Sequence, residues 1–177
     1  MRFFTPKRFI ELHRIKRLYK RAFPITEKKP FSVILRMHKL GKTDIWYFEH
    51  KGKFIGLATT INGPREVLID YFAVEKKYRG RGYGTAMLKT LINLYSPLGV
   101  FLEIEIPYPN GERYREKAAR KNFYLNAGLS DMHTQVKLFG VDMELLGTRC
   151  SFDFEKYRKF YLENYGKLAY KNIKTIK

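Results

Sequence analysis

Three glycines and two arginines lie close together in the segment Arg79-Gly80-Arg81-Gly82-Tyr83-Gly84. Glycine adopts positive φ angles and lets a bound group come close to the backbone. Where such a turn opens a helix, backbone N–H groups and the positive end of the helix dipole favour a phosphate. The arginines add positive charge, so the segment is a candidate phosphate-binding turn.

The residues on either side of this turn predict a strand before it and a helix after it. The apolar, β-branched and aromatic run from Val67 to Val74 is typical of a buried strand. After the turn, apolar residues recur at helical spacing from Ala86 to Ile92. The glycine order is G-x-G-x-G. A Walker loop needs Lys-Ser/Thr after its last glycine and a dinucleotide fingerprint needs G-x-G-x-x-G, so neither matches.

The pattern R-x-x-G-x-G from Arg79 to Gly84, following a strand that ends at Val74, resembles the pyrophosphate-binding turn of the GNAT superfamily. Members of this superfamily are N-acetyltransferases that depend on acetyl-CoA. The resemblance implies that acetyl-CoA is the co-substrate, that strand backbone binds its pantetheine arm, and that the turn holds its pyrophosphate. The residues it implies for cofactor binding are Phe72, Ala73, Val74, Arg79, Gly80, Arg81, Gly82, Tyr83, Gly84 and Thr85.

A second segment, Asn122 to Leu129, is similar to the F-Y-x-x-x-G-F stretch that ends the fourth helix of that fold, with leucine in place of the last phenylalanine. Its Tyr124 matches the tyrosine that many members use to protonate the leaving thiolate. The alternative is a core tyrosine on an apolar helix face. Many members carry an asparagine seven residues earlier, where this chain has Lys117, so that cofactor contact does not carry over.

Two carboxylates are candidates for the base that deprotonates the acceptor amine. Leu102-Glu103-Ile104-Glu105 is similar to the L-E-V-R stretch of bacterial ribosomal-protein alanine acetyltransferases, in which the Glu is the base. Burying a carboxylate in an apolar strand is costly unless it is paired or solvated, and the strand period of two puts Glu103 and Glu105 on one face. The alternative is a solvated pair. Asp70 is the rival base, two residues after Leu68, where the histone-type branch has its catalytic Glu.

The expected fold class is α+β: a GNAT acyltransferase fold whose mixed, mostly antiparallel sheet contains one splayed parallel strand pair, flanked by helices, with an extra C-terminal helix. Thr5 and Pro6 predict the start of the first helix, with Phe9, Leu12, Ile15, Tyr19 and Ala22 on its buried stripe. The predicted helices cover residues 5–22, 31–39, 82–95, 112–126 and 154–170. The predicted strands cover 44–49, 54–61, 66–74, 100–106, 129–138 and 143–148.

Length and composition fit one globular domain, residues 1–177, with a core of about 5–148 and a C-terminal helix of about 152–170. The longest run without a charge is too short to span a bilayer, the N-terminus has charges where a signal peptide needs apolar residues, and Cys150 is the single cysteine. These features predict a cytoplasmic protein. The four histidines lack metal-ligand spacing, so no metal is expected.

The formal net charge of +18 favours anionic partners, including polyphosphate cofactors and nucleic acid. The main hypothesis is transfer of an acetyl group from acetyl-CoA to a primary amine, by direct attack in a ternary complex. The alternatives are an acyl-CoA-binding sensor without turnover and a basic nucleic-acid-binding protein, although the RNA-recognition motif and Cys/His finger spacings are missing. The sequence names neither the amine, small molecule or peptide, nor whether the protein is a monomer or a homodimer.

Overall fold

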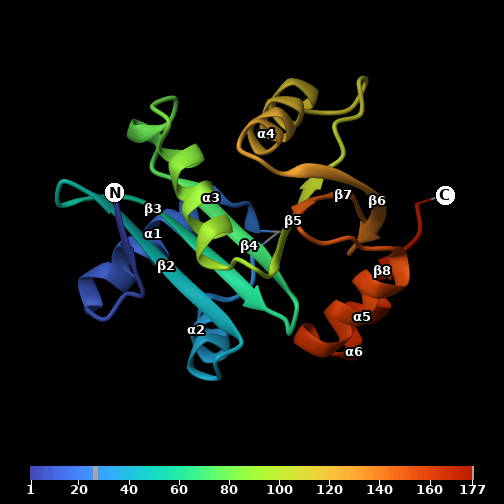
Figure 1. Ribbon diagram of the computed structural model, residues 1–177, viewed down its shortest axis with the longest axis horizontal. Helices are drawn as coiled ribbons and strands as arrows, with labels where there is room; N and C mark the ends of the chain where they lie inside the picture. Colours follow the sequence, from blue (N-terminus) through green and yellow to red (C-terminus); the bar gives the residue numbers. More distant parts are fainter. Residues whose placement is uncertain (26–27, 177) are drawn as a thin grey trace. The chain divides into compact units, whose positions relative to one another are not determined.

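The structure is a computed structural model that describes residues 1–25 and 28–176 (Figure 1). Its strands are hydrogen-bonded in the order β1-β2-β3-β4-β5-β7-β6-β8, with β4 and β5 parallel and the sheet otherwise mostly antiparallel. Helices flank this mixed sheet, which confirms the predicted α+β class. The chain divides into two compact units, Met1–Asn62 with Ile69–Thr90, and Gly63–Leu68 with Leu91–Lys177. That the chain forms a single domain stays a prediction.

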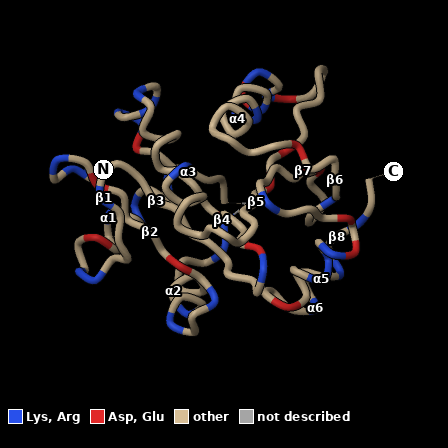
Figure 2. The backbone as a smooth tube through the Cα atoms, in the orientation of Figure 1, with Lys and Arg blue, Asp and Glu red and all other residues tan. Residues whose placement is uncertain are grey.

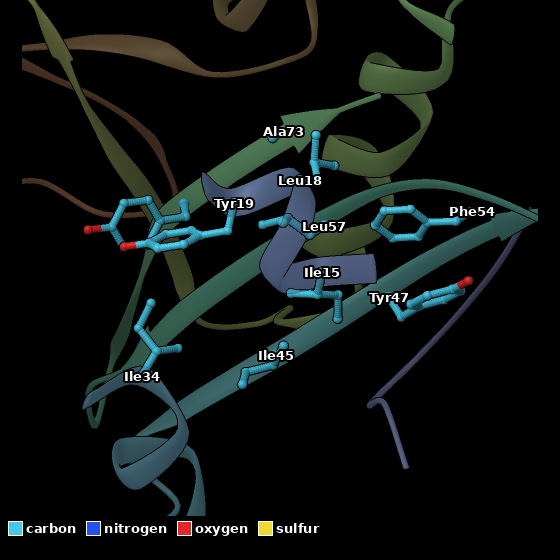
Figure 3. Close-up of a cluster of buried hydrophobic side chains, with 10 residues drawn as sticks. Ile15, Leu18, Tyr19, Ile34, Ile45, Tyr47, Phe54, Leu57 and Ala73 are labelled. Atoms are coloured by element: carbon cyan, nitrogen blue, oxygen red, sulfur yellow. The ribbon is translucent and has the colours of Figure 1, made fainter. Parts of the chain in front are cut away.

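The first unit holds the N-terminal helices, most of the meander and the helix after the glycine turn. Its elements are β1 (Arg2–Phe4), α1 (Phe9–Ala22), α2 (Phe31–Lys39), β2 (Thr43–His50), β3 (Lys53–Asn62), most of β4 (Glu66–Val74) and most of α3 (Tyr83–Leu94). Its core joins α1, α2 and three strands (Figure 3). The buried side chains of this cluster are Ile15, Leu18, Tyr19, Ile34, Ile45, Tyr47, Phe54, Leu57, Tyr71 and Ala73.

The second unit begins with the first residues of β4, which pair in parallel with β5. The register runs from Glu66 opposite Gly99 to Leu68 opposite Phe101, which confirms the parallel pair expected from a strand–helix–strand connection. The remaining elements are β5 (Gly99–Glu105), α4 (Tyr114–Asn126), β6 (Ser130–Leu138), β7 (Val141–Thr148), α5 (Phe154–Tyr165), α6 (Lys167–Lys171) and β8 (Ile173–Lys174).

The predicted start of the first helix at Thr5–Pro6 is wrong. Residues 2–4 instead form β1, antiparallel to the end of β2, and the chain reaches α1 only at Phe9. Glu11 supplies the cap, because its carboxylate accepts the backbone N–H groups of Lys7 and Arg8, each at 3.0 Å. This shift leaves Phe9 83 % exposed, so the first position of the predicted stripe does not belong to the core.

The C-terminal helix predicted over 154–170 is two helices. Asp153 caps α5 through a 2.7 Å hydrogen bond from the Lys156 N–H. Gly166 then takes φ 83° and ψ −176°, which a helix cannot continue through, and α6 follows. The chain ends in the short strand β8, antiparallel to β6, which the sequence did not predict.

Gly56 of β3 sits where the sheet and α3 come closest in the first unit. A Cβ atom there would lie 2.4 Å from the Ala73 carbonyl oxygen and 2.8 Å from the Met87 Cε atom. The nearest obstacle is backbone, which cannot rotate away. Glycine is therefore required by packing at this position.

We predict that Gly56→Ala lowers the free energy of unfolding by about 1–3 kcal/mol, the usual cost of overpacking a core. Denaturant unfolding measures this loss. Gly52→Ala is the control, since Gly52 has φ 70° and open space around its Cβ position, so only conformational strain operates there. If the two variants lose equal stability, the close approach at Gly56 is not the cause.

Candidate functional site

The glycine-rich turn joins the end of β4 to the first turn of α3. After Val74 the chain makes a 3-10 turn at Lys76–Tyr78, and Gly80 and Gly82 follow at φ 69° and 75°. The first helical hydrogen bond runs from the Ala86 N–H to the Gly82 carbonyl at 3.0 Å. The N–H groups of residues 83–85 thus head the helix, where no intrahelical carbonyl accepts them. This is the geometry expected from the glycine spacing.

A side-chain hydrogen bond holds the turn against the strand end, and the space beside its glycines is open. The Arg79 Nε donates to the Val74 carbonyl at 3.1 Å, which ties the turn back to the strand end. At both Gly80 and Gly82, an added Cβ would have no atom within 4 Å. Arg81 is exposed. The glycines are therefore needed for their backbone angles, and the space beside them can admit a ligand.

The strand residues before the turn differ in the direction of their backbone groups. The Glu75 N–H donates to the Ile55 carbonyl at 2.8 Å, and the Ala73 carbonyl lies against Gly56, so both residues face β3. In a strand, alternate residues direct their N–H and C=O groups to opposite edges. Phe72 and Val74 therefore direct theirs to the other edge of β4. Of the three predicted pantetheine-binding residues, these two have the suitable direction.

Positive charge lines a pocket beside the 3-10 turn at Lys76–Tyr78. A pocket of about 480 Å³ is lined by side chains of α1, the β2–β3 turn and the 3-10 turn, five of them cationic. Figure 2 shows lysines and arginines in the segment just before α3. The one carboxylate of the pocket, Glu75, is paired with Arg21 at 2.8 Å. The lining residues are Arg14, Arg17, Arg21, Gly52, Lys53, Phe54, Glu75, Lys77 and Tyr78.

Asp70 is bound by a lysine within the first unit. The Lys29 ammonium lies 2.7 and 2.8 Å from the two carboxylate oxygens, and the aspartate side chain is 11 % exposed. The same lysine lies 5.4 Å from the centre of the Tyr71 ring. This pairing could not be predicted from the sequence, because Lys29 belongs to a loop 41 residues away.

Tyr124 lies on α4 in the second unit and is 8 % exposed. Burial raises the pKa of the Tyr124 phenol to about 12, while the positive charge of Arg120 lowers it in part. The ring packs 5.0 Å from that of Phe123. The phenol is therefore protonated at neutral pH, which is the state a proton donor needs.

Glu103 lies on β5 and accepts two hydrogen bonds on one carboxylate oxygen. The hydroxyls of Tyr157 and Tyr161 donate to Oε1 at 2.7 and 2.8 Å. Both tyrosines come from α5. Burial, with the negative charge of Glu103, raises the pKa of Tyr157 well above its ordinary value. Glu103 is thus a partnered carboxylate in the strand, as its apolar surroundings require.

Glu105, two residues further along β5, pairs with α4 instead. The Lys117 ammonium lies 2.7 Å from its Oε2, and the Arg120 guanidinium lies 3.8 Å from its Oε1. Lys117 stands where the resemblance expects an asparagine. The structure gives this lysine a partner within the protein.

The partners of Glu103 and Asp70 were not predicted from the sequence. The aromatic side of the last helix was visible as Tyr157, Phe160, Tyr161 and Tyr165, but helical spacing alone does not say which strand it meets. The i, i+4 spacing of Tyr157 and Tyr161, opposite a strand carboxylate in need of a partner, was the available signal. For Lys29 there was none.

Among the parts of the chain that the structure describes, no group of three or more His, Cys, Asp or Glu could hold a metal ion. No described helix is long and apolar enough to cross a bilayer. Burial, helped by the charge of Glu66, raises the pKa of the Cys150 thiol to about 11, so this thiol is protonated at neutral pH.

A model of the acetyltransferase (GNAT) family matches residues 12–117, more than half of the chain. The chain belongs to this family. The matched segment includes the glycine-rich turn and the strands on both sides of α3, and it ends within α4 before Tyr124. A comparison with curated proteins found no match.

Solved structures share the fold. A GNAT-family acetyltransferase from Bacteroides thetaiotaomicron has a TM-score of 0.75 and 22 % identity, over 94 % of this chain and 99 % of that one. Arabidopsis thaliana NAA60, solved with acetyl-CoA, has 0.61 and 16 %, over 83 % and 97 %. The ribosomal-protein-S18-alanine N-acetyltransferase from Escherichia coli has 0.59 and 16 %, over 85 % and 94 %. At these identities the similarity establishes the fold alone.

Proposed function

We propose that this protein is an N-acetyltransferase that moves the acetyl group of acetyl-CoA to a primary amine by direct attack in a ternary complex. The observation that carries the proposal is the turn between β4 and α3, with Gly80 and Gly82 at positive φ and open space beside them. It lies within the segment that matches the family model. The amine acceptor is a small molecule or a peptide.

The first unit has the features that the diphosphate of acetyl-CoA needs. The N–H groups of residues 83–85 and the positive end of the α3 dipole favour two neighbouring negative charges. Arg79 and Arg81 add positive charge, and the Thr85 hydroxyl can donate. Phe72 and Val74 would bind the pantetheine arm with backbone groups directed away from β3. A loop that does not open a helix, or a glycine turn covered by other side chains, would not combine free N–H groups, a helix dipole and added positive charge.

The second unit supplies the proposed proton transfers. The amine nitrogen forms a bond to the thioester carbon and gives its proton to Glu103. The carbon–sulfur bond breaks, and the departing thiolate takes the proton of the Tyr124 hydroxyl, which solvent then restores. The products are the amide and free CoA, with the proton left on Glu103 returned to water.

The contacts of the two candidate bases favour Glu103 over Asp70. Both oxygens of Asp70 bind the Lys29 ammonium, so protonating this carboxylate would leave a lysine that is 32 % exposed without its partner. Glu103 is held through Oε1 by neutral hydroxyls, and accepting a proton breaks no ion pair with them. The ion pair of Asp70 with Lys29 is better explained as a contact that fixes the loop carrying Lys29.

A direct test is release of free CoA when the purified protein meets acetyl-CoA and a panel of amines. The panel contains polyamines, aminoglycosides, amino acids and peptides with free N-termini, including one that begins with alanine. Calorimetry with acetyl-CoA alone separates binding from turnover. Tight binding without release on any amine would favour the acyl-CoA sensor. Absence of binding, with salt-dependent binding of RNA, would favour the nucleic-acid alternative.

We predict that Gly82→Ala raises the dissociation constant for acetyl-CoA by more than about tenfold, near 1.4 kcal/mol. A side chain there would enter the open space beside the turn and disturb the backbone that receives the diphosphate. Calorimetry measures the change. Gly41→Ala is the matched control, since Gly41 has φ 71° and open surroundings as Gly82 has φ 75°, but lies between α2 and β2. Equal affinity in the two variants would remove the turn from the cofactor site.

We predict that Tyr124→Phe lowers kcat by roughly 10² while acetyl-CoA affinity is kept, because one hydroxyl is lost and little volume. The pKa of about 12 has a consequence for pH. A donor must be protonated, so its contribution persists through the alkaline range and is lost only as the pH rises towards 12. The ratio of wild-type to variant kcat should thus stay constant from pH 7 to pH 10. A variant with wild-type kcat would make Tyr124 a core residue only.

We predict that Glu103→Gln lowers kcat by about 10² and removes the rising limb of the pH–rate profile, because the amide keeps the shape but not the basicity. Asp70→Asn should have the smaller effect on kcat. The reverse ranking would make Asp70 the base. If neither variant changes the profile, neither carboxylate takes the proton.

A further inference from the structure

The C-terminal helix α5 brings two phenol hydroxyls to one oxygen of Glu103. The distances to Oε1 are 2.7 Å from Tyr157 and 2.8 Å from Tyr161. Both donors meet the same atom, so this oxygen accepts and carries no proton. The two tyrosines therefore fix one oxygen of the carboxylate.

The arrangement follows from helix geometry. Residues four apart lie on the same face of an α-helix, one turn above the other, so Tyr157 and Tyr161 project together. Their rings lie 4.9 Å apart and are 0 % and 5 % exposed. Such buried rings cannot swing their hydroxyls elsewhere without repacking. The two donors are therefore fixed in direction as well as in distance.

Several contacts fix α5 itself within the second unit. Its first turn is capped by Asp153, and Lys156 forms an ion pair with Glu66 at 2.7 Å. The Phe160 ring packs edge-on against Phe101 of β5, with centroids 5.1 Å apart. These contacts fix the position of α5 against β5, the strand that carries Glu103.

The helix α5 also packs closely against the chain just before β4. A Cβ atom at Gly63 would lie 2.8 Å from the Phe160 ring, so that glycine leaves room for the helix. Residues 154–165 lie beyond the segment that matches the family model, which ends at residue 117. The hydrogen bonds from α5 to Glu103 thus come from a helix outside the segment that the family model describes.

We propose that Tyr157 and Tyr161 are positioning residues for the acetyl transfer, which orient the Glu103 carboxylate for taking the proton of the acceptor amine. This proposal rests on the proposed function. Removing the two hydroxyls takes two fixed donors from the carboxylate and so weakens the orientation that proton transfer needs. The tyrosines themselves exchange no proton and touch no substrate.

The test uses the full chain and the amine of the panel above on which the wild-type protein is most active. Tyr157→Phe and Tyr161→Phe keep the buried rings and remove only the hydroxyls. We expect each change to lower kcat by about fivefold or more and the double change by about tenfold or more, with KM for acetyl-CoA unchanged.

A double-mutant cycle then shows whether the tyrosines act through Glu103. In the Glu103→Gln background, the same Tyr→Phe changes should alter kcat by less than about twofold, because the group they orient is gone. Tyr170→Phe is the control, since it removes a hydroxyl from α6 whose ring faces Arg158 and not Glu103.

Two results would overturn the inference while leaving the proposed function intact. One is a folded Tyr157→Phe, Tyr161→Phe protein with lowered thermal stability and wild-type kcat, which would make the hydroxyls purely structural. The other is an equal loss of kcat in the wild-type and Glu103→Gln backgrounds. Failure of the proposed function looks different, because the wild-type protein would then release no CoA with any amine, and the inference would fall with it.

Discussion

The close approach of α3 to β3 is the constraint on which the first unit depends. Met87 and Leu88 of this helix are fully buried. Met87 approaches so closely that β3 has glycine at position 56. A helix held in this way has a fixed axis and a fixed first turn. The positive φ angles of Gly80 and Gly82 then follow, because the chain must reverse from the strand end into that turn. The direction of the helix dipole, and so the place where an anion is favoured, is set by apolar packing.

In the second unit, the apolar strand β5 contains two carboxylates, and each needs a partner. Glu103 and Glu105 alternate with the buried Leu102 and Ile104, and each acid has its own kind of partner. Phenol hydroxyls hold Glu103 and cations hold Glu105. Neutral donors satisfy a carboxylate without cancelling its charge, whereas a lysine at 2.7 Å neutralises it. The two hydroxyls on Oε1 of Glu103 are neutral, whereas Glu105 and Asp70 each bind a lysine, and this difference supports the proposal that Glu103 is the base.

The parts of the fold that local rules determine could be predicted from the sequence. The bounds of α2 and β4 matched, and so did the turn at Phe139 and Gly140, where both residues have positive φ. The failures came where distant contacts override local signals. Thr5 and Pro6 favour a helix start, but pairing of residues 2–4 with β2 keeps the chain extended there. Gly166 divides the last helix, and β8 pairs with the edge of β6, a contact between distant parts of the chain.

The candidate site divides along the same line. The conformation of the glycine turn followed from its spacing, while the role of Tyr124 rests on a resemblance and stays a prediction. The partner of Asp70 could not be predicted, since Lys29 is 41 residues away, and the partners of Glu103, 54 residues away, were indicated only by the i, i+4 spacing of Tyr157 and Tyr161.

Charge gives the last link between composition and the proposed site. The chain has 35 lysines and arginines and 17 acids, an excess of 18 cations. Several acids form ion pairs, among them Glu11 with Arg8, Asp70 with Lys29, Glu75 with Arg21 and Glu105 with Lys117. Each of these ion pairs uses one lysine or arginine. The excess positive charge therefore lies on other lysines and arginines, including the exposed Lys76 and Arg81. A positive field around a backbone anion site speeds the arrival of a polyanionic co-substrate, and it weakens as salt rises. The same field attracts anions and repels cations, so raising the salt concentration weakens both effects.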